Sequence, residues 1–296
     1  MSLEEPFVTY LELRESTPEG DATAGLSHKS SGLVLLHVLE LAAAGEPRGA
    51  VTIVHDAGGH GGRYIGLARA LAQRGWSVAL PDLRGHGRSE GARGHSNGLR
   101  EVLRDIGDVQ DHLAYRQPEA PKVLVGHGLG AIYALAYASE KPDGVSALVL
   151  AAPLFEPRFD LPQAVGGVMK LFKKILPTSE GRIGFTTGDL STDPTENARR
   201  AADELVHDKI TVRAATQAVE AAQTYAARLG SLAMPALVLQ GSEDPIARPD
   251  LVRRLAHPPV ELETFTGLRH DLFHESATAD VCARSCDWLD QKLPRA

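Results

Sequence analysis

Cysteine is scarce in this sequence: Cys282 and Cys286 are its two cysteines among 296 residues. Their spacing places them one turn apart on what we expect to be the last helix, where they cannot cross-link distant parts of the chain. The first ten residues, MSLEEPFVTY, do not combine a charged region with a long apolar stretch. A disulfide-stabilised secreted fold is therefore excluded, and we expect a cytoplasmic protein in a reducing environment.

Long apolar runs and basic clusters are also missing. No apolar run approaches the roughly 18 residues that a membrane-spanning helix needs. The formal net charge is -7 and the isoelectric point is about 5.9, without a cluster of lysine and arginine. Nucleic acid and stable membrane insertion are therefore not expected. With 43% hydrophobic and 23% charged residues, the composition is that of an ordinary globular protein.

Short apolar runs rich in valine and leucine alternate with helical patterns along most of the chain. Such runs are typical of strands that are buried on both faces, so we predict an α/β fold with a mainly parallel, doubly wound sheet. Functional residues then belong at the carboxyl ends of the strands. The predicted strands are 7–13, 33–41, 50–56, 76–82, 122–126, 147–153, 235–241 and 260–267, and the predicted helices include 63–74, 98–115 and one at the C-terminus.

About eighty residues in the middle of the chain show no clear strand pattern. Two amphipathic stretches, 165–176 and 211–229, predict helices there. We therefore predict a core formed by 1–153 and 233–296, with a helical cap at 154–232 that covers the strand ends. A small acyl or ester ligand would bind under this cap.

The segment Gly126-His127-Gly128-Leu129-Gly130 joins a predicted strand to a predicted helix. One interpretation is a dinucleotide-binding fingerprint, Gly126-x-Gly128-x-x-Ala131. Two observations oppose it: the turn follows a late strand, and the next strand ends in Ala-Ala-Pro where an acidic residue for the ribose is needed. A second interpretation is a purely structural tight turn.

The third interpretation is a nucleophile elbow of the form Gly-x-Ser-x-Gly, in which Gly128 occupies the serine position. The glycines on either side would relieve clashes in a sharp turn, and the backbone N-H of Leu129 would serve as an oxyanion donor. Glycine at the strained position would relieve about 1 to 3 kcal/mol of backbone strain. It would also remove the nucleophile.

Such an elbow needs an acid and then a histidine later in the chain, each after its own strand. Asp244 follows the strand at 235–241, and His270 follows the strand at 260–267. A lone Asp before proline is commonly a turn residue, and a lone histidine is commonly a hydrogen-bonded loop residue. Their order and strand-end placement favour a pair that acts together.

At these residues the chain resembles the α/β-hydrolase superfamily, in particular its monoacylglycerol lipase and lysophospholipase branch. The similar blocks are VHDAGGHGGRYIGLARALAQRGW, PDLRGHGRSEGARGHSNGL, DELVH and MPALVLQGSEDP, and together they span nearly the whole chain. The resemblance implies Asp244 as catalytic acid, His270 as base, and Ala57 and Leu129 as oxyanion donors. It implies Ser-His-Asp hydrolysis of carboxylic esters, without a cofactor.

Two positions depart from that family pattern. Gly128 replaces the nucleophilic serine, and Asp56 stands where the family has glycine beside the oxyanion donor. A carboxylate that faces the oxyanion hole would oppose catalysis, because stabilisation of the developing negative charge is commonly the largest catalytic contribution. We therefore expect this chain to hydrolyse esters poorly.

Two other patterns have simpler explanations. The stretch from His270 to His274 superficially matches the zinc-binding pair His-Glu-x-x-His, but that pair requires a continuous helix, and a strand end and loop are predicted here. Arg84, His86 and Arg88 in PDLRGHGRSEG are expected to shape a turn. We therefore predict neither a metal nor a cofactor.

Three hypotheses for function remain open. In the first, the chain is a serine esterase or lipase that was silenced by the change to Gly128. In the second, it is a natural non-catalytic homologue that binds an acyl ligand or a partner protein, which the additional change at Asp56 favours. In the third, His270, oriented by Asp244, activates a water molecule without an acyl-enzyme.

Overall fold

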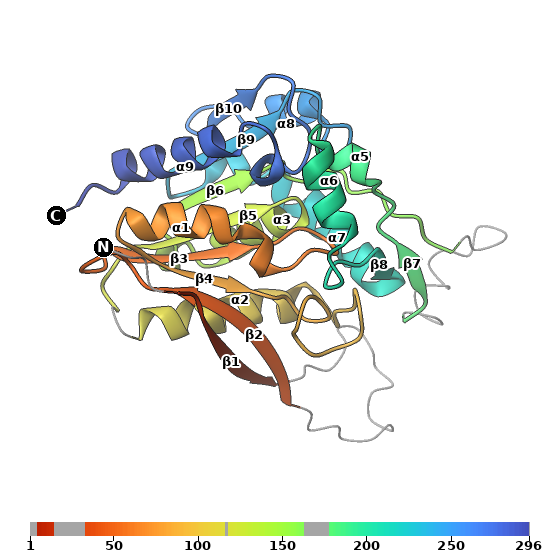
Figure 1. The fold of residues 1–296 in the computed structure, drawn as a ribbon, viewed down its shortest axis with the longest axis horizontal. Coiled ribbons are helices and arrows are strands. Elements are labelled where there is room, and N and C mark those ends of the chain that lie inside the picture. The colour runs from red at the N-terminus through yellow and green to blue at the C-terminus, as the bar shows by residue number, and fades with distance from the viewer. Residues whose placement is uncertain (1–4, 15–32, 116–117, 163–177, 296) are drawn as a thin grey trace.

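The computed structural model describes residues 5–14, 33–115, 118–162 and 178–295. Within this part of the chain, eight strands form one central sheet with helices on both faces (Figure 1). The sheet order is β1-β2-β4-β3-β5-β6-β9-β10. The strands are β1 (Phe7–Arg14), β2 (Leu33–Leu41), β3 (Gly49–Val54), β4 (Trp76–Pro81), β5 (Lys122–His127), β6 (Ala147–Ala151), β9 (Ala236–Gly241) and β10 (Glu261–Phe265).

The sheet is mainly parallel, as predicted. Strand β2 is antiparallel to both β1 and β4, while every neighbouring pair from β4 to β10 is parallel. The carboxyl ends of β3, β5, β6, β9 and β10 consequently lie at one edge. The predicted α/β class with a doubly wound sheet is confirmed.

Successive side chains of the strands pack alternately into two apolar layers, one on each face of the sheet. Val123 and Val125 of β5 pack on the face covered by α1 (Ile65–Gln73) and α9 (Thr278–Lys292). Leu124, between them, packs on the opposite face with α2 (Leu99–Ala114) and α3 (Leu129–Glu140). This period of two is the geometry of a strand buried on both sides, and it holds the strand ends in fixed register.

The segment between β6 and β9 contains two short strands as well as helices. Strand β7 (Glu180–Arg182) pairs antiparallel with β8 (Lys209–Thr211), although the sequence shows no clear strand pattern there. Three-residue strands are too short to produce a recognisable alternation in sequence. The helices are α5 (Thr187–Leu190), α6 (Pro194–Ala201) and α7 (Val212–Ala226), the last matching the helix predicted at 211–229.

The predicted helix at 165–176 lies outside the described residues. Cys282 and Cys286 lie on α9 as predicted, and both are free and buried. No helix in the described ranges has both the length and the apolar character to cross a bilayer. The remaining elements are η1 (Gly61–Tyr64), η2 (Pro142–Gly144), η3 (Leu229–Ser231), η4 (Leu272–His274) and α8 (Pro249–Leu255).

Candidate active site

The predicted site residues follow four strands that end at the same edge of the sheet. Asp56 follows β3, Gly128 follows β5, Asp244 follows β9 and His270 follows β10. Because these strands are parallel, their carboxyl ends bring residues that are far apart in sequence into one cluster. The structure therefore assembles the residues that sequence analysis selected.

The turn between β5 and α3 has the sharp geometry of an elbow. Gly128 adopts φ 56° and ψ -116°, a region that strongly favours glycine. Gly130 allows the first turn of α3 to approach the end of β3 closely, since a Cβ on it would lie 2.4 Å from the carbonyl oxygens of Val54 and His55. Residue 128 therefore has the backbone conformation predicted for an elbow, with glycine at its tip.

Asp244 and His270 form a close buried pair. His270 Nδ1 lies 2.9 Å from Asp244 Oδ2, and His270 is fully buried. Asp244 also accepts hydrogen bonds from the backbone of Ile246 at 2.8 Å and of Ala247 at 2.9 Å. These bonds fix the carboxylate, which in turn orients the imidazole.

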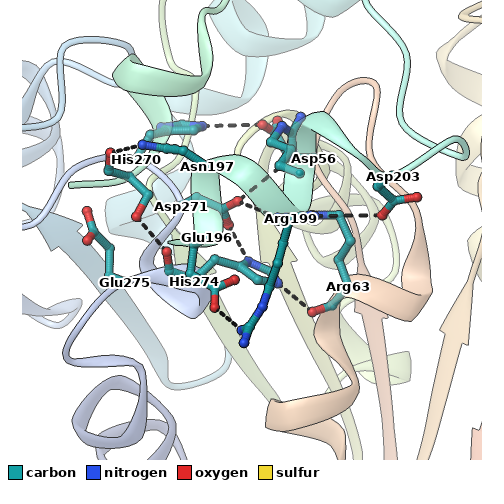
Figure 2. A network of polar contacts seen from close by, with 12 residues as sticks. Asp56, Arg63, Glu196, Asn197, Arg199, Asp203, His270, Asp271, His274 and Glu275 are labelled. Carbon is teal, nitrogen blue, oxygen red and sulfur yellow. Dashed lines mark hydrogen bonds and ion pairs between the residues drawn. The ribbon is translucent and has the colours of Figure 1, made fainter. Parts of the chain in front are cut away.

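Asp56 faces the elbow, a direction that could not be predicted from the sequence. The backbone N-H of Leu129, predicted as an oxyanion donor, donates a 2.7 Å hydrogen bond to Asp56 Oδ1. Asp56 Oδ2 lies 3.4 Å from His270 Nε2 (Figure 2), whereas Asp244 contacts Nδ1, the other ring nitrogen. A carboxylate thus occupies the space between the elbow and the histidine.

The Asp56 carboxylate also excludes a side chain at position 128. A Cβ built on Gly128 would lie 2.0 Å from Asp56 Oδ1 and 2.2 Å from its Cγ. Real Cβ atoms do not approach other atoms so closely. In this conformation Asp56 and a residue larger than glycine at position 128 cannot coexist.

Asp56, His270 and Asp244 form a triad of charged groups. Burial alone would lower the pKa of His270, but Asp244 and Asp56 together raise it to about 10. Burial alone would raise the pKa of Asp56, but its contacts with His270 and other donors lower it to about 2. At neutral pH, two carboxylates therefore flank one imidazolium.

The clash at position 128 gives a first prediction. Gly128→Ala is expected to lower the free energy of unfolding by at least about 1 to 3 kcal/mol, the usual cost of a non-glycine residue in such a backbone conformation. In the Asp56→Gly background, the same change should cost less because the contact with the carboxylate is gone. Urea unfolding of the four proteins of this cycle measures the difference.

Gly66 provides the matched control for that cycle. It lies inside helix α1, and a Cβ built on it would meet nothing within 4 Å. Gly66→Ala should be neutral or stabilising, because alanine is the better helix former. Equal costs of Gly128→Ala with and without Asp56 would show that the two positions do not interact.

A second set of hydrogen bonds, not found from the sequence, connects Asp56 to His270 through their backbones. Asp56 N donates to the Tyr64 hydroxyl at 3.2 Å, and that hydroxyl donates to His127 Nδ1 at 2.7 Å. His127 Nε2 then donates to the carbonyl oxygen of His270 at 3.0 Å. His127, which lies between Gly126 and Gly128 of the elbow, therefore holds the loop that carries His270.

Asp271, next to His270, is the centre of a network that joins the core to α6 (Figure 2). Its carboxylate lies 3.2 Å from Arg63 Nη2 and 2.8 Å from His274 Nδ1. Arg200 of α6 lies 3.8 Å from it, and Arg63 also lies 3.8 Å from Asp203. Arg63 lies in the block VHDAGGHGGRYIGLARALAQRGW, which resembles the family. That resemblance was the one indication in the sequence that Arg63 belongs near the site.

His270 and His274 bind different partners, so they do not form the metal pair considered from sequence. His274 lies on the short 3-10 helix η4, whereas His270 precedes it and contacts Asp244 and Asp56. Across the described ranges, no group of three or more potential ligands is arranged to hold a metal ion.

The contacts of the PDLRGHGRSEG turn mainly hold its backbone in place. Asp82 accepts hydrogen bonds from the backbone of Gly61 and Arg88, at 2.7 and 2.8 Å. Arg84 makes two 2.8 Å hydrogen bonds with Asp105 of α2. These bonds hold the turn beside the strand ends, as expected.

A pocket opens beside Asp56, between the strand ends and the segment that joins β6 to β9. Its empty volume is about 520 Å³ with its mouth included. The core contributes both predicted oxyanion donors, Ala57 and Leu129, and the β6–β9 segment contributes Ile183, Ile210 and Ala214. The pocket is therefore lined both by residues at the strand ends and by residues of the segment between β6 and β9.

The strand order, the elbow and the Asp-His pair that follows β9 and β10 define an α/β-hydrolase. The chain belongs to the serine aminopeptidase S33 family, whose model matches residues 45–277. It is 30% identical over 253 residues to a monoacylglycerol lipase of Mycolicibacterium smegmatis, with 84% of this chain and 90% of that protein covered. It is also 30% identical over 262 residues to the human monoglyceride lipase, covering 85% and 86% of the two chains.

Solved structures show the same fold. The monoacylglycerol lipase of Paleococcus ferrophilus has a TM-score of 0.78 and 26% identity, covering 87% of this chain and 99% of that one. A soluble variant of the Saccharomyces cerevisiae monoglyceride lipase has a TM-score of 0.79 at 16% identity, covering 99% and 96%. The predicted resemblance to monoacylglycerol lipases is confirmed, while the roles of the individual site residues stay predictions.

Proposed function

We propose that this chain does not hydrolyse carboxylic esters and instead binds an acyl chain or another apolar small molecule in the pocket beside Asp56. The observation that carries this proposal is the position of the Asp56 carboxylate. It accepts the hydrogen bond of Leu129 N and lies against His270, so one of the two predicted oxyanion donors is occupied and a fixed negative charge stands beside the elbow. The acyl ligand is suggested by the relatives named monoacylglycerol lipase.

Loss of the nucleophilic serine would not by itself require an aspartate at residue 56. Gly128 removes the nucleophile, and Asp56 independently places a fixed negative charge where a tetrahedral intermediate would develop one. Two obstacles at one centre favour a non-catalytic protein over an esterase that lacks a single residue. The pocket beside them remains open for a ligand.

The same geometry opposes hydrolysis by a water molecule that His270 activates. A general base must be unprotonated, whereas the flanking carboxylates raise the pKa of His270 to about 10. The space that the serine hydroxyl would fill holds the Asp56 carboxylate rather than a cavity suited to water. This route is therefore less well supported than ligand binding.

The parent protein should therefore fail as an esterase. Hydrolysis of p-nitrophenyl acetate and octanoate is expected to be no faster than with His270→Ala, and a fluorophosphonate should not label either protein. Release of p-nitrophenol and intact-protein mass spectrometry measure these outcomes. Turnover that depends on His270 would contradict the proposal.

Ligand binding is tested separately by filling the pocket. Ala214 lines it and is buried, so Ala214→Phe should occupy part of its volume. Octanol binding, measured by calorimetry, should weaken at least about tenfold in this variant because pocket contacts are lost. Equal binding to both proteins would place the ligand elsewhere.

A further inference from the structure

Strand β8 (Figure 1) forms part of the pocket wall and lies directly on two loops of the core. Just before β8, the N-H of His207 donates to the carbonyl oxygen of Gly58 at 3.0 Å. At the end of β8, the N-H of Thr211 donates to the carbonyl oxygen of Gly94, also at 3.0 Å. A Cβ on Gly58 would lie 2.1 Å from the carbonyl oxygen of His207, so glycine is needed for this close approach. Movement of β8 away from these loops would open the pocket.

Three imidazole rings meet at this junction between the core and the segment that carries β8. The centroid of the His86 ring, in the PDLRGHGRSEG turn, lies 5.1 Å from that of His55, which follows β3. It lies 4.7 Å from that of His207. His55 and His86 line the pocket, and His207 lines an adjoining cavity that shares Ala57 and Ile183 with it.

The hydrogen bonds of two of these rings fit only the neutral form of histidine. His207 Nε2 donates to the carbonyl oxygen of Gly85 at 3.1 Å, and its Nδ1 accepts from the N-H of Lys209 at 3.2 Å. His55 Nδ1 donates to a backbone carbonyl oxygen at 2.8 Å, and its Nε2 accepts from the N-H of Leu83 at 2.9 Å. A proton on either accepting nitrogen would point at an N-H donor and break that bond.

The closed junction therefore binds fewer protons than an open one. Burial lowers the pKa of His207 below 6.5, and burial together with His55 and His207 holds the pKa of His86 well below that value. Burial lowers the pKa of His55 to about 4. Hydrated rings in an open junction would return to about 6.5. The stability of the closed junction is therefore fully present above pH 6.5 and is lost as pH falls below it.

Charged groups on the neighbouring elements do not reverse this direction. Besides burial, Arg93 and Lys209 lower the pKa of His207. The pKa of His86 stays low although Asp82 opposes the effect of burial. Cations thus face the ring on the β8 side, and a proton there would be repelled.

Two carboxylates line the same cavity as His207, and each is bound by another side chain. Asp208 Oδ2 lies 2.6 Å from Arg182 Nε, and Asp203 Oδ2 lies 2.9 Å from His60 Nε2. Their charges are therefore taken up by these partners rather than by the His207 ring. The remaining titratable side chains that line the pocket beside the rings are Asp56, Arg84, His95 and Asp105.

We propose that β8 is an acid-opened gate of this pocket: in mildly acidic solution, protons taken up by His207 and His86 separate β8 from the core and release the ligand. Two imidazolium rings at the present separation would repel each other, and the bond from the N-H of Lys209 would be lost. The inference rests on the proposed ligand-binding function and adds its regulation by pH.

Hydrogen exchange on the ligand-free protein tests the gate itself. The protection factors of the His207 and Thr211 amides should fall at least about tenfold between about pH 7.5 and about pH 5.5, since each histidine that gains a proton on opening contributes up to about tenfold per pH unit. The amide of Val125, inside the central sheet, is the internal reference and should change little. Equal falls at all three amides would indicate loss of the whole fold and overturn the gate.

Variants that cannot gain a proton identify the histidines responsible. His207→Asn keeps an oxygen that can accept from the N-H of Lys209, and His86→Phe keeps a ring beside its neighbours. In the double variant, the ratio of β8 protection at the two pH values should fall below about threefold. Each single variant should retain part of the ratio, and these decide the question if the double variant does not fold. A purely structural role would lower protection equally at both pH values and leave the ratio unchanged.

His257→Asn is the matched control, because this histidine is exposed and lies on the loop between α8 and β10. It removes one titrating ring and should leave the ratio at β8 as in the parent. A loss of the ratio in this control equal to that in His207→Asn would overturn the assignment to the junction.

Octanol, which is uncharged at both pH values, connects the gate to the ligand. Its dissociation rate, measured by NMR exchange, should rise at least about tenfold between about pH 7.5 and about pH 5.5, and less in His207→Asn. If octanol binds but leaves equally fast at both pH values, the gate is wrong and the ligand-binding function stands. If octanol binds at neither pH, that function is wrong, and the hydrogen exchange of β8 decides separately whether acid opens the junction.

Discussion

The double variant Asp56→Gly with Gly128→Ser is expected to hydrolyse short p-nitrophenyl esters at least about a thousandfold faster than the parent chain. The serine hydroxyl would stand at the elbow, within reach of His270, and the N-H of Leu129 would be free to bind an oxyanion. Removal of the Asp56 carboxylate would also lower the pKa of His270 towards the range of a general base. Ester hydrolysis and fluorophosphonate labelling at residue 128 measure the gain.

The two single variants are the controls for this experiment. Gly128→Ser alone should remain inactive, because its Cβ meets the Asp56 carboxylate and the oxyanion donor stays occupied. Asp56→Gly alone should remain inactive, because it lacks a nucleophile. A folded double variant without labelling would show that the site differs from a serine hydrolase beyond these two residues.

His270→Ala should be the most destabilising single change at the site. It leaves Asp56 and Asp244 buried without their shared cation, and removal of one partner from a buried ion pair commonly costs about 3 to 5 kcal/mol. Chemical unfolding near neutral pH measures the loss. His257→Ala, at an exposed loop histidine, is the control and should change stability little.

The interaction of His270 with Asp56 and Asp244 also makes the free energy of unfolding depend on pH. The pKa of His270 rises from 6.5 to about 10 on folding, so its contribution is fully present below pH 6.5 and is lost as pH rises through about 10. The parent should therefore lose stability across this alkaline range, and His270→Ala should lose less. Parallel pH profiles for the two proteins would contradict a charged His270 in the folded state.

Most of the fold could be predicted from local hydrophobic patterns, which involve residues that are close in sequence. The valine-rich and leucine-rich runs predicted the inner strands of the central sheet, because strands buried on both faces are continuously apolar. The edge strands β1 and β10, whose side chains are partly exposed, were predicted from the mixed apolar and polar runs at 7–13 and 260–267. The short strands β7 and β8 were missed because three residues carry no periodic signal. The boundaries of the predicted cap at 154–232 stay a prediction.

The site was predicted in its members but not in their arrangement. Strand-end position and chain order were sufficient to select Asp244 and His270, because parallel strands place their carboxyl ends together. The direction of the Asp56 side chain depends on a contact with the N-H of Leu129, 73 residues away in sequence. The roles of Tyr64 and His127 likewise depend on contacts between loops that no local pattern describes.

The close approach of Asp56 to Gly128 has a consequence for the history of this chain. A single mutation that restores serine at residue 128 places its Cβ against the carboxylate, and a single mutation of Asp56 restores no nucleophile. We expect neither intermediate to hydrolyse esters, so selection for that activity would favour neither first step. On the function proposed here, the two residues together would act as an evolutionary ratchet: a change to an ester hydrolase would require both mutations, and drift alone would have to supply one of them.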